Sequence, residues 1–281
     1  MNASAPIKPS HGLTVSEQFC YSTVRIECDT GTGTAFYFQF PVDATTFVPM
    51  LITNRHVVAG AKRGRLLLHL ADPGRRPNGK HLGFEIDQFE LAWRHHPDTS
   101  LDLCALPMAN VLNQATDLGH RPFYIAFEAG STITQAELRD LSALEDIVMI
   151  GYPNGIWDSV NNMPVIRRGI TATHPKLDYE GRPEFMIDAA CFPGSSGSPV
   201  VLYNAGTYAT RDEIHLGSRV KLLGVLYAGP QHTAAGELQV VTVPTQQKLV
   251  AFSRIPNNLG LVIKATKLEA FRTLFAGLPA V

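Results

Sequence analysis

The chain has 281 residues, of which 45% are hydrophobic and 17% charged, and its formal net charge is −1. This is the composition of a globular protein with one large domain or two small ones. Its 24 lysines and arginines are scattered, so no strongly basic surface for nucleic acid or an anionic membrane is predicted. No run approaches the roughly 20 apolar residues of a membrane-spanning helix. We expect neither nucleic acid nor a membrane as a partner.

The N-terminus and the cysteines bear on the cellular compartment. The first residues lack the basic start and the apolar core of a secretory signal. Cys20 and Cys28 flank one predicted strand, which disfavours a disulfide between them. With Cys104 and Cys191 they make four cysteines, and no pair has metal-ligand spacing. We therefore expect reduced thiols and a cytoplasmic protein.

Short β-type runs dominate the chain after a flexible lead-in over residues 1–14. Runs this frequent, separated by Gly, Pro, Asn and Asp, are typical of β-barrels or a sandwich. A capping box at residues 134–137 predicts a short helix, and helices are also expected over 244–252 and 267–275. The expected strands are 22–27, 34–40, 47–53, 65–70, 147–150, 164–167, 184–187, 199–203, 222–226 and 238–243.

Strand signals become sparse between about residues 108 and 145, which indicates a connection between two β-halves. The predicted organisation is an N-terminal barrel over 15–115, a connection with a short helix over 116–145, a C-terminal barrel over 146–255, and a strand and helix extension over 256–281.

The segment 191–200, CFPGSSGSPV, has the composition of a loop that presents a serine nucleophile. Gly194 can adopt backbone angles that a residue with a Cβ cannot. Its N–H and that of Ser196 can then converge where an oxyanion would develop. Gly197 leaves the approach to the Ser196 hydroxyl open. Gly-, Ser- and Pro-rich segments are also ordinary turns, so this segment alone leaves a plain turn as an alternative.

A serine needs a base, because its hydroxyl is almost fully protonated at neutral pH. His56 follows an apolar strand and precedes a short helical turn ending at Gly60, where it can face a cleft. Asp102 lies in an apolar run, and a buried carboxylate is costly without a partner such as an imidazole. Taken alone, a structural His56, a turn-capping Asp102 and Asp98 as a rival carboxylate all stay open.

The three residues occur in the order His56, Asp102, Ser196, which distinguishes chymotrypsin-type triads from subtilisin and α/β-hydrolase ones. Around them the chain resembles the trypsin-like serine peptidases, specifically the bacterial branch with HtrA-type and V8-like enzymes. The resemblance covers about residues 15–255. It rests on 53–58 (TNRHVV), 102–106 (DLCAL) and 188–199, with support from 31–36, 150–153 and 223–226.

The resemblance implies an all-β fold of two six-stranded antiparallel barrels of the chymotrypsin type, followed here by the C-terminal helix. Ser196 would attack the scissile carbonyl, His56 would carry the proton, and Asp102 would orient His56. The amides of Gly194 and Ser196 would form the oxyanion hole. A protein or peptide substrate would add as an extended strand beside residues 226–229.

The predicted primary specificity pocket carries no charge. Trypsins have an aspartate six residues before the nucleophile, where this chain has Ala190. V8-like enzymes use a histidine on the cleft strand, and residues 225–227 contain none. We expect Ala190, Cys191, Tyr227 and Gly229 to bind substrate, and a small or medium apolar P1 residue to fit best. For Cys191, a buried apolar role and a redox-sensing role both stay open.

Ser195 occupies the position where digestive trypsins carry the aspartate that pairs with a new N-terminus. No Ile-Val-Gly-Gly-like start is present, so we expect no activation by that ion pair. No PDZ-like segment follows the peptidase part, so selection would depend on the cleft, the loops or a regulatory protein partner. No cofactor or metal is expected, because the adjacent His95 and His96 would point to opposite sides of a strand.

The resulting hypothesis is a bacterial serine endopeptidase of narrow specificity with partner-gated activity. Two alternatives stay open. One is a catalytically silent trypsin-fold module that binds proteins. The other is an esterase or acyl transferase, because a Ser-His-Asp triad does not by itself distinguish an amide from an ester.

Overall fold

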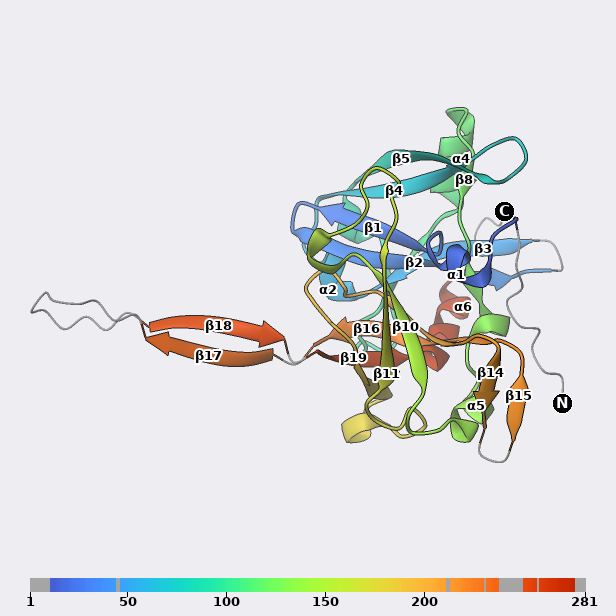
Figure 1. Ribbon diagram of the computed structural model, residues 1–281. Helices are drawn as coiled ribbons and strands as arrows, with labels where there is room; N and C mark the ends of the chain where they lie inside the picture. The colour runs from blue at the N-terminus through green and yellow to red at the C-terminus, as the bar shows by residue number, and fades with distance from the viewer. Residues whose placement is uncertain are drawn as a thin grey trace, which may run out of the picture.

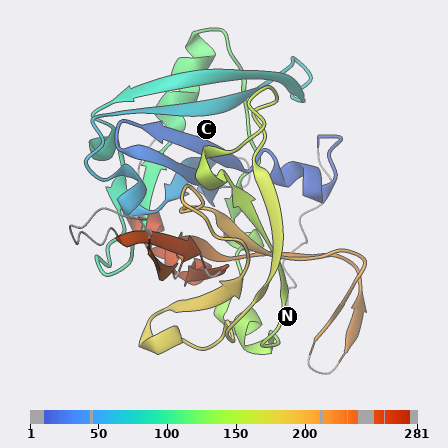
Figure 2. The same ribbon diagram turned by 60° about the vertical axis from the view of Figure 1, so that its left-hand side comes forward.

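The computed structural model describes residues 11–43, 46–210, 213–229, 231–237, 250–256 and 258–275. Strands dominate these residues, and the helices are short. The strands form two β-halves that pack against each other, seen from two sides in Figures 1 and 2. The all-β architecture predicted from the sequence is confirmed.

The first half is a nine-stranded sheet that follows α1 (Val15–Phe19). Its path runs β5-β4-β1-β2-β3-β7-β6, with β8 added to β4 and β9 added to β2. The strands are β1 (Thr23–Cys28), β2 (Gly31–Pro41), β3 (Phe47–Thr53), β4 (Arg63–Ala71), β5 (Pro77–Asp87), β6 (Arg94–His95), β7 (Cys104–Pro107), β8 (Pro122–Phe123) and β9 (Phe127–Glu128), and the helices between them are α2 (Arg55–Val58), α3 (Phe89–Ala92) and α4 (Ala109–Asp117).

The first sheet therefore reaches beyond residue 115, into the predicted connection. Both added strands have only two residues, too few for an alternating pattern to be visible in the sequence. The helix predicted from the capping box is confirmed as α5 (Gln135–Asp140). The Thr134 hydroxyl accepts from the Glu137 amide there, and the Glu137 carboxylate accepts from the Thr134 amide.

The second half is a closed barrel of six strands in the order β10-β11-β12-β19-β16-β13. This confirms the barrel that the resemblance implies for this half. The barrel closes through β19, which lies beyond residue 255 and pairs with both β12 and β16. Its strands are β10 (Asp146–Gly151), β11 (Val165–Thr171), β12 (Glu184–Asp188), β13 (Pro199–Asn204), β16 (Arg219–Ala228) and β19 (Leu259–Lys264).

Two hairpins and the C-terminus complete the described chain. β14 (Thr207–Ala209) pairs with β15 (Ile214–Leu216), and β17 (Gln231–Glu237) pairs with β18 (Val250–Pro256) in a ribbon that projects from the second half (Figure 1). The helix predicted over 267–275 is confirmed by the 3₁₀ turn Ala265–Ala270 and α6 (Phe271–Leu274).

The helix predicted over 244–252 is wrong at residues 250–252, which begin β18. Pairing with β17 along seven residues overrides the local helical pattern there. Residues 244–249 of that prediction, and the strand predicted over 238–243, lie outside the described residues.

One apolar cluster joins the two halves and so fixes the cleft between them. It contains Phe36 and Phe38 of β2, and Ile150 and Val201 of the barrel, all with no more than 2% of their surface exposed. Burial of each such side chain contributes about 1.5–3 kcal/mol. Phe271 of α6 packs on the same cluster, so the C-terminal helix stabilises the junction.

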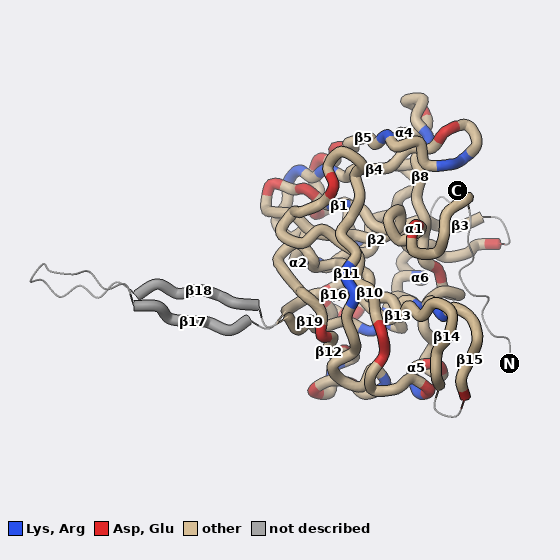
Figure 3. Tube along the Cα trace, viewed as in Figure 1, with Lys and Arg blue, Asp and Glu red and all other residues tan. Residues whose placement is uncertain are grey.

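Charges of both signs are interspersed over the two halves (Figure 3). Among the helices that the structure describes, none combines the length and apolar character needed to cross a bilayer.

Candidate active site

His56 lies where the strand β3 of the first sheet ends. Asn54 leaves the strand in an extended conformation, and α2 begins at the next residue. The helix ends before Gly60, whose φ of +73° turns the chain away. The His56 side chain is 49% exposed, so the helical turn that the sequence predicts delivers an accessible imidazole.

Asp102 holds His56 at two points. Its Oδ1 accepts from the His56 backbone amide at 3.0 Å, and its Oδ2 contacts the ring nitrogen Nδ1. The Asn54 side chain donates to the Asp102 carbonyl at 2.8 Å, which fixes the carboxylate-bearing loop to the end of β3. The rival Asp98 is instead bonded to the amide and hydroxyl of Ser100 in a turn.

The environment of Asp102 keeps its carboxyl ionised. Burial alone raises the pKa of Asp102, but the hydrogen bonds and charge of His56, together with the charge of Arg55, outweigh burial. The pKa of Asp102 therefore lies below its ordinary value of 3.8. An ionised Asp102 accepts a hydrogen bond from Nδ1–H of His56, which leaves Nε2 as the basic nitrogen.

The loop between β12 and β13 carries Ser196 and two glycines in the left-handed region. Gly194 has φ +84° and Gly197 has φ +85°. Within the described parts of the chain, neither the Gly194 amide nor the Ser196 amide donates a hydrogen bond. Two uncommitted amides beside a serine are what an oxyanion site requires.

The Ser196 hydroxyl donates to the carbonyl oxygen of Tyr227 on β16, at 3.4 Å. Among the described residues, no hydrogen bond joins Ser196 to His56. The structure thus brings His56 and Asp102 into contact, and holds the Ser196 hydroxyl against the cleft strand. Catalytic hydrogen bonds are often loose in substrate-free enzymes and tighten on binding.

A cavity of about 250 Å³ opens beside Ser196, and no charged side chain lines it. Cys191, Tyr227 and Gly229 line it as the sequence predicts. Ala190 is not among its lining residues, because its carbonyl faces the Arg167 side chain and accepts a hydrogen bond from Nη1. The remaining lining residues are Phe192, Pro193, Ser196, Leu226 and Ala228.

Two residues that the sequence reasoning did not assign also contact the nucleophile loop. The Thr34 hydroxyl on β2 donates to the Gly194 carbonyl at 2.9 Å. The Arg167 side chain on β11 donates to the Ser195 hydroxyl at 2.8 Å. For Thr34 the sequence does hold a signal, a polar residue just before a run of buried apolar ones. For Arg167 it holds none.

Residues 31–208, more than half of the chain, match the family model of the trypsin-like peptidase domain. The matched region contains His56, Asp102 and Ser196. This chain belongs to the trypsin-like peptidase family. It is accordingly a serine peptidase, which is a hydrolase. No curated protein matches it significantly.

Solved structures similar to this peptidase include the inactive form of the Rv3671c protease from M. tuberculosis, with 16% identity, a TM-score of 0.46 and 98% coverage of both chains. The HtrA-type protease AlgW with a tripeptide has 17% identity and a TM-score of 0.45, over 95% of this chain and 64% of AlgW. A human pathogenic astrovirus serine protease has 11% identity and a TM-score of 0.41, over 94% and 95% of the two chains.

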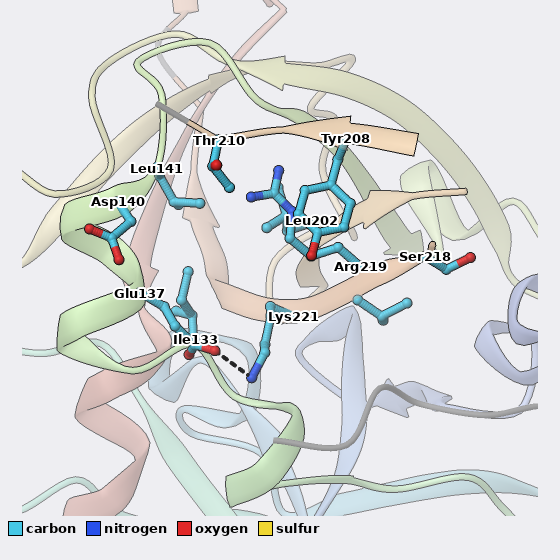
Figure 4. Close-up of a pocket in the computed structure, with 11 residues that line it drawn as sticks. Ile133, Glu137, Asp140, Leu141, Leu202, Tyr208, Thr210, Ser218, Arg219 and Lys221 are labelled. Carbon is cyan, nitrogen blue, oxygen red and sulfur yellow. Dashed lines mark ion pairs between the residues drawn. The ribbon is translucent and has the colours of Figure 1, made fainter. Parts of the chain in front are cut away.

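The peptidase has a second cavity, of about 320 Å³, between α5, β13, β16 and the hairpin β14–β15 (Figure 4). Lys221 pairs with Glu137 there at 2.9 Å, and the Arg219 guanidinium lies over the Tyr208 ring at 4.5 Å. The side chains that line this cavity include no serine–histidine or cysteine–histidine pair. None of the site residues predicted from the sequence lines this cavity, whereas Cys191, Ser196, Tyr227 and Gly229 line the smaller one.

The other histidines and the thiol of Cys191 have structural surroundings. His96 is buried; its Nδ1 accepts from the Asp98 amide and its Nε2 donates to the Lys267 carbonyl, both at 3.0 Å. No three metal-ligating side chains cluster in the described part of the peptidase. Burial raises the pKa of Cys191 to about 11, so little reactive thiolate forms at neutral pH.

Proposed function

We propose that this peptidase is an endopeptidase in which Ser196 is the nucleophile, His56 the general base and Asp102 the residue that orients it. The observation that carries the proposal is the double contact of Asp102 with the amide and ring of His56. The bond to the amide fixes the carboxylate, and the contact with Nδ1 then fixes the ring orientation, which a histidine with a purely structural role at the protein surface would not need.

In the proposed reaction, Ser196 Oγ attacks the scissile carbonyl carbon while its proton passes to Nε2 of His56. The imidazolium that forms is stabilised by Asp102. Collapse of the tetrahedral intermediate expels the amine, which takes the proton from His56, and leaves an acyl group on Ser196. Water, deprotonated by His56, then attacks the acyl group in the same way, which releases the carboxylic acid product and restores the Ser196 hydroxyl.

The amides of Gly194 and Ser196 are the proposed oxyanion donors. Neither is committed to another acceptor among the described residues, so both can donate to the oxygen that becomes negative. Loss of one such donor slows comparable enzymes by about 10²–10³-fold. These amides are thus a large part of the proposed rate enhancement.

For the substrate, we propose an extended peptide that pairs with the end of β16 and residues 226–229. A cavity of about 250 Å³ without a charged lining residue supports a small or medium apolar P1 side chain. Burying a charged P1 side chain there would carry a desolvation cost without a partner.

We also propose that a regulatory protein partner gates this activity. The hydrogen bond from Ser196 Oγ to the Tyr227 carbonyl supports a resting state, because it ties the proposed nucleophile to the strand that would bind substrate. A partner or substrate that displaces this bond frees the hydroxyl for His56. A cytoplasmic location belongs to the same proposal, and the four free cysteines support it.

Labelling with a fluorophosphonate probe tests the nucleophile. The expected result is covalent labelling of the wild-type enzyme, none of Ser196→Ala and very slow labelling of His56→Ala. Ser198→Ala is the matched serine control. Labelling that survives Ser196→Ala would remove Ser196 from its role.

The same probe separates the alternatives. Labelling only after a binding protein is added would support gating, and no labelling in any condition would favour the silent binding module. An ester and an amide of the same peptide then distinguish the endopeptidase from an esterase, because the endopeptidase must cleave the amide.

A further inference from the structure

The side chain of Arg167 on β11 is half-buried and points to the inner side of the strand, where an apolar side chain is usual. Its neighbours Ile166 and Arg168 are outward, with Ile166 39% exposed and the Arg168 side chain 76% exposed. Arg168 pairs with Asp146 at the surface. Residues alternate between the two faces of a strand, so the apolar Ile166 and the charged Arg167 have exchanged the positions that burial alone would favour.

The Arg167 guanidinium contacts the nucleophile loop at two points. Nη1 donates to the Ala190 carbonyl, and Nη2 donates to the Ser195 hydroxyl at 2.8 Å. Ser195 is fully buried, and its hydroxyl also accepts from the Phe192 amide at 3.4 Å. Both ends of the segment 190–195 therefore rest on one side chain.

This arrangement carries an energetic penalty. Burial lowers the pKa of Arg167, yet a guanidinium stays charged in proteins. No carboxylate pairs with it within the described residues, and its buried Nε has no hydrogen-bond partner there. An apolar side chain in this inward position would avoid the desolvation of a charge. The arginine is therefore better explained by what it holds than by stability.

The segment that Arg167 holds contains the groups on which the chemistry depends. Cys191, Phe192 and Pro193 form one wall of the cavity beside Ser196. Gly194, at φ +84°, supplies a proposed oxyanion amide. Glycine rotates between backbone regions with little resistance, so the direction of that amide must be set by the residues on either side of it.

We propose that Arg167 is a positioning residue that holds the nucleophile loop in its reactive conformation. Its guanidinium supplies a positive charge next to Ser195, from within the chain. This inference rests on the proposed function of Ser196. It also explains how the loop can be ordered without an aspartate at position 195.

Two measurements on Arg167→Gln test this proposal, with Arg168→Gln as the matched control on the same strand. The first is hydrogen exchange of the Phe192 and Ser195 amides, which needs no catalysis. The second is the rate of fluorophosphonate labelling. We expect faster exchange and labelling slowed by about 10²-fold, the loss typical of one misplaced oxyanion donor. Arg168→Gln should match the wild type in both.

Rescue separates positioning from general support of the fold. Arg167→Lys keeps a cation and should recover part of the labelling rate, and guanidinium ion added to Arg167→Ala should do the same. If Arg167→Gln fails to fold, Ser195→Ala carries the test, because it removes the accepting hydroxyl while Arg167 keeps its bond to Ala190. In that variant the exchange is read at the Ser195 amide, because the Phe192 amide loses its own acceptor; Ser195 should exchange faster, and labelling should slow.

Unchanged exchange of the Phe192 and Ser195 amides in Arg167→Gln, or of the Ser195 amide in Ser195→Ala where that variant replaces it, would overturn the role of Arg167. A wild-type enzyme that does not label in any condition, with or without a binding protein, would overturn the proposed function instead, and the exchange comparison would still decide whether Arg167 holds the loop.

Discussion

The backbone amide of Thr34 donates a hydrogen bond to the carbonyl oxygen of Ser196 at 3.0 Å. The first sheet is thus bonded to the proposed nucleophile itself. The Thr34 hydroxyl extends this link, since it accepts from the Tyr152 amide at 3.1 Å as well as donating to the Gly194 carbonyl. Thr53 in turn donates to the Thr34 carbonyl at 2.6 Å. The two halves meet through Thr34 at the serine.

Replacing Thr34 by valine keeps the side-chain shape and removes the hydroxyl. The Tyr152 amide and the Gly194 carbonyl then lose a buried partner, and each unsatisfied group costs about 1–3 kcal/mol. We expect the free energy of unfolding to fall by about 2–4 kcal/mol, and fluorophosphonate labelling to slow. Thr32→Val, at an exposed position of the same strand, should change neither. Equal stability of the two variants in urea would contradict this prediction.

Gly197 must be glycine for two reasons that a pair of variants separates. Its φ is +85°, and a Cβ there would collide with the backbone oxygen of Thr34. Gly206 has φ +90° with open space around it. Gly206→Ala should cost only the roughly 1–2 kcal/mol of the left-handed conformation. Gly197→Ala should cost more and abolish labelling, because the Ser196 backbone must move. Comparable urea midpoints would contradict the collision.

The strands and the helix cap could be predicted because their signals are local. The pattern predicts β3 at 47–53 with the bounds that the structure gives, and the Thr134–Glu137 box begins α5. β8 and β9 could not be predicted, because two-residue strands carry no period. The ribbon β17–β18 depends on pairing along the chain, which overrides the local preference of residues 250–252.

The candidate site divides in the same way. His56 and Ser196 lie in segments whose own composition predicts a strand end and a turn. Arg167 differs from Arg168 in nothing that the sequence displays. Two features of the fold decide which arginine turns inward: the register of β11 against β10, with Met149 opposite Arg167, and the position of the loop 190–195, which Arg167 contacts.

Cys191 lines the cavity beside Ser196, so it should set the size of P1. An ideal Cβ at Gly260 would lie 2.6 Å from the Cys191 sulfur, which shows how closely the thiol is packed. Cys191→Ala should shift the kcat/KM ratio by about 10-fold toward a P1 residue one methylene larger, as one methylene is worth at least about 1 kcal/mol. A peptide library measures the shift.

Cys20→Ala, remote from the cavity lining, is the control and should leave the P1 profile unchanged. Cleavage mainly after Lys, Arg or Glu in the wild type would contradict an uncharged pocket. An unchanged profile in Cys191→Ala would remove this residue from P1 selection.

His69 on β4 should make the peptidase sensitive to mild acid. Burial, and next the charge of His81 opposite it, lower the pKa of His69 to about 4 from an ordinary 6.5. Its buried Nε2 has no hydrogen-bond partner among the described residues. The unfolded chain therefore takes up a proton below about pH 6.5, and the folded chain only below about pH 4.

The unfolding free energy should be fully retained above pH 6.5 and should fall by about 3 kcal/mol between pH 6.5 and 4, since one pKa unit is worth about 1.4 kcal/mol. In His69→Phe, whose phenyl ring can keep the edge contact that His69 makes with Tyr21, the unfolding free energy should change little between pH 6.5 and 4, so the fall over this range, the acid limb, should disappear. His95→Phe, at an exposed position, should leave it in place. Urea unfolding across this pH range measures both, and a limb that persists in His69→Phe would assign the acid sensitivity to other groups.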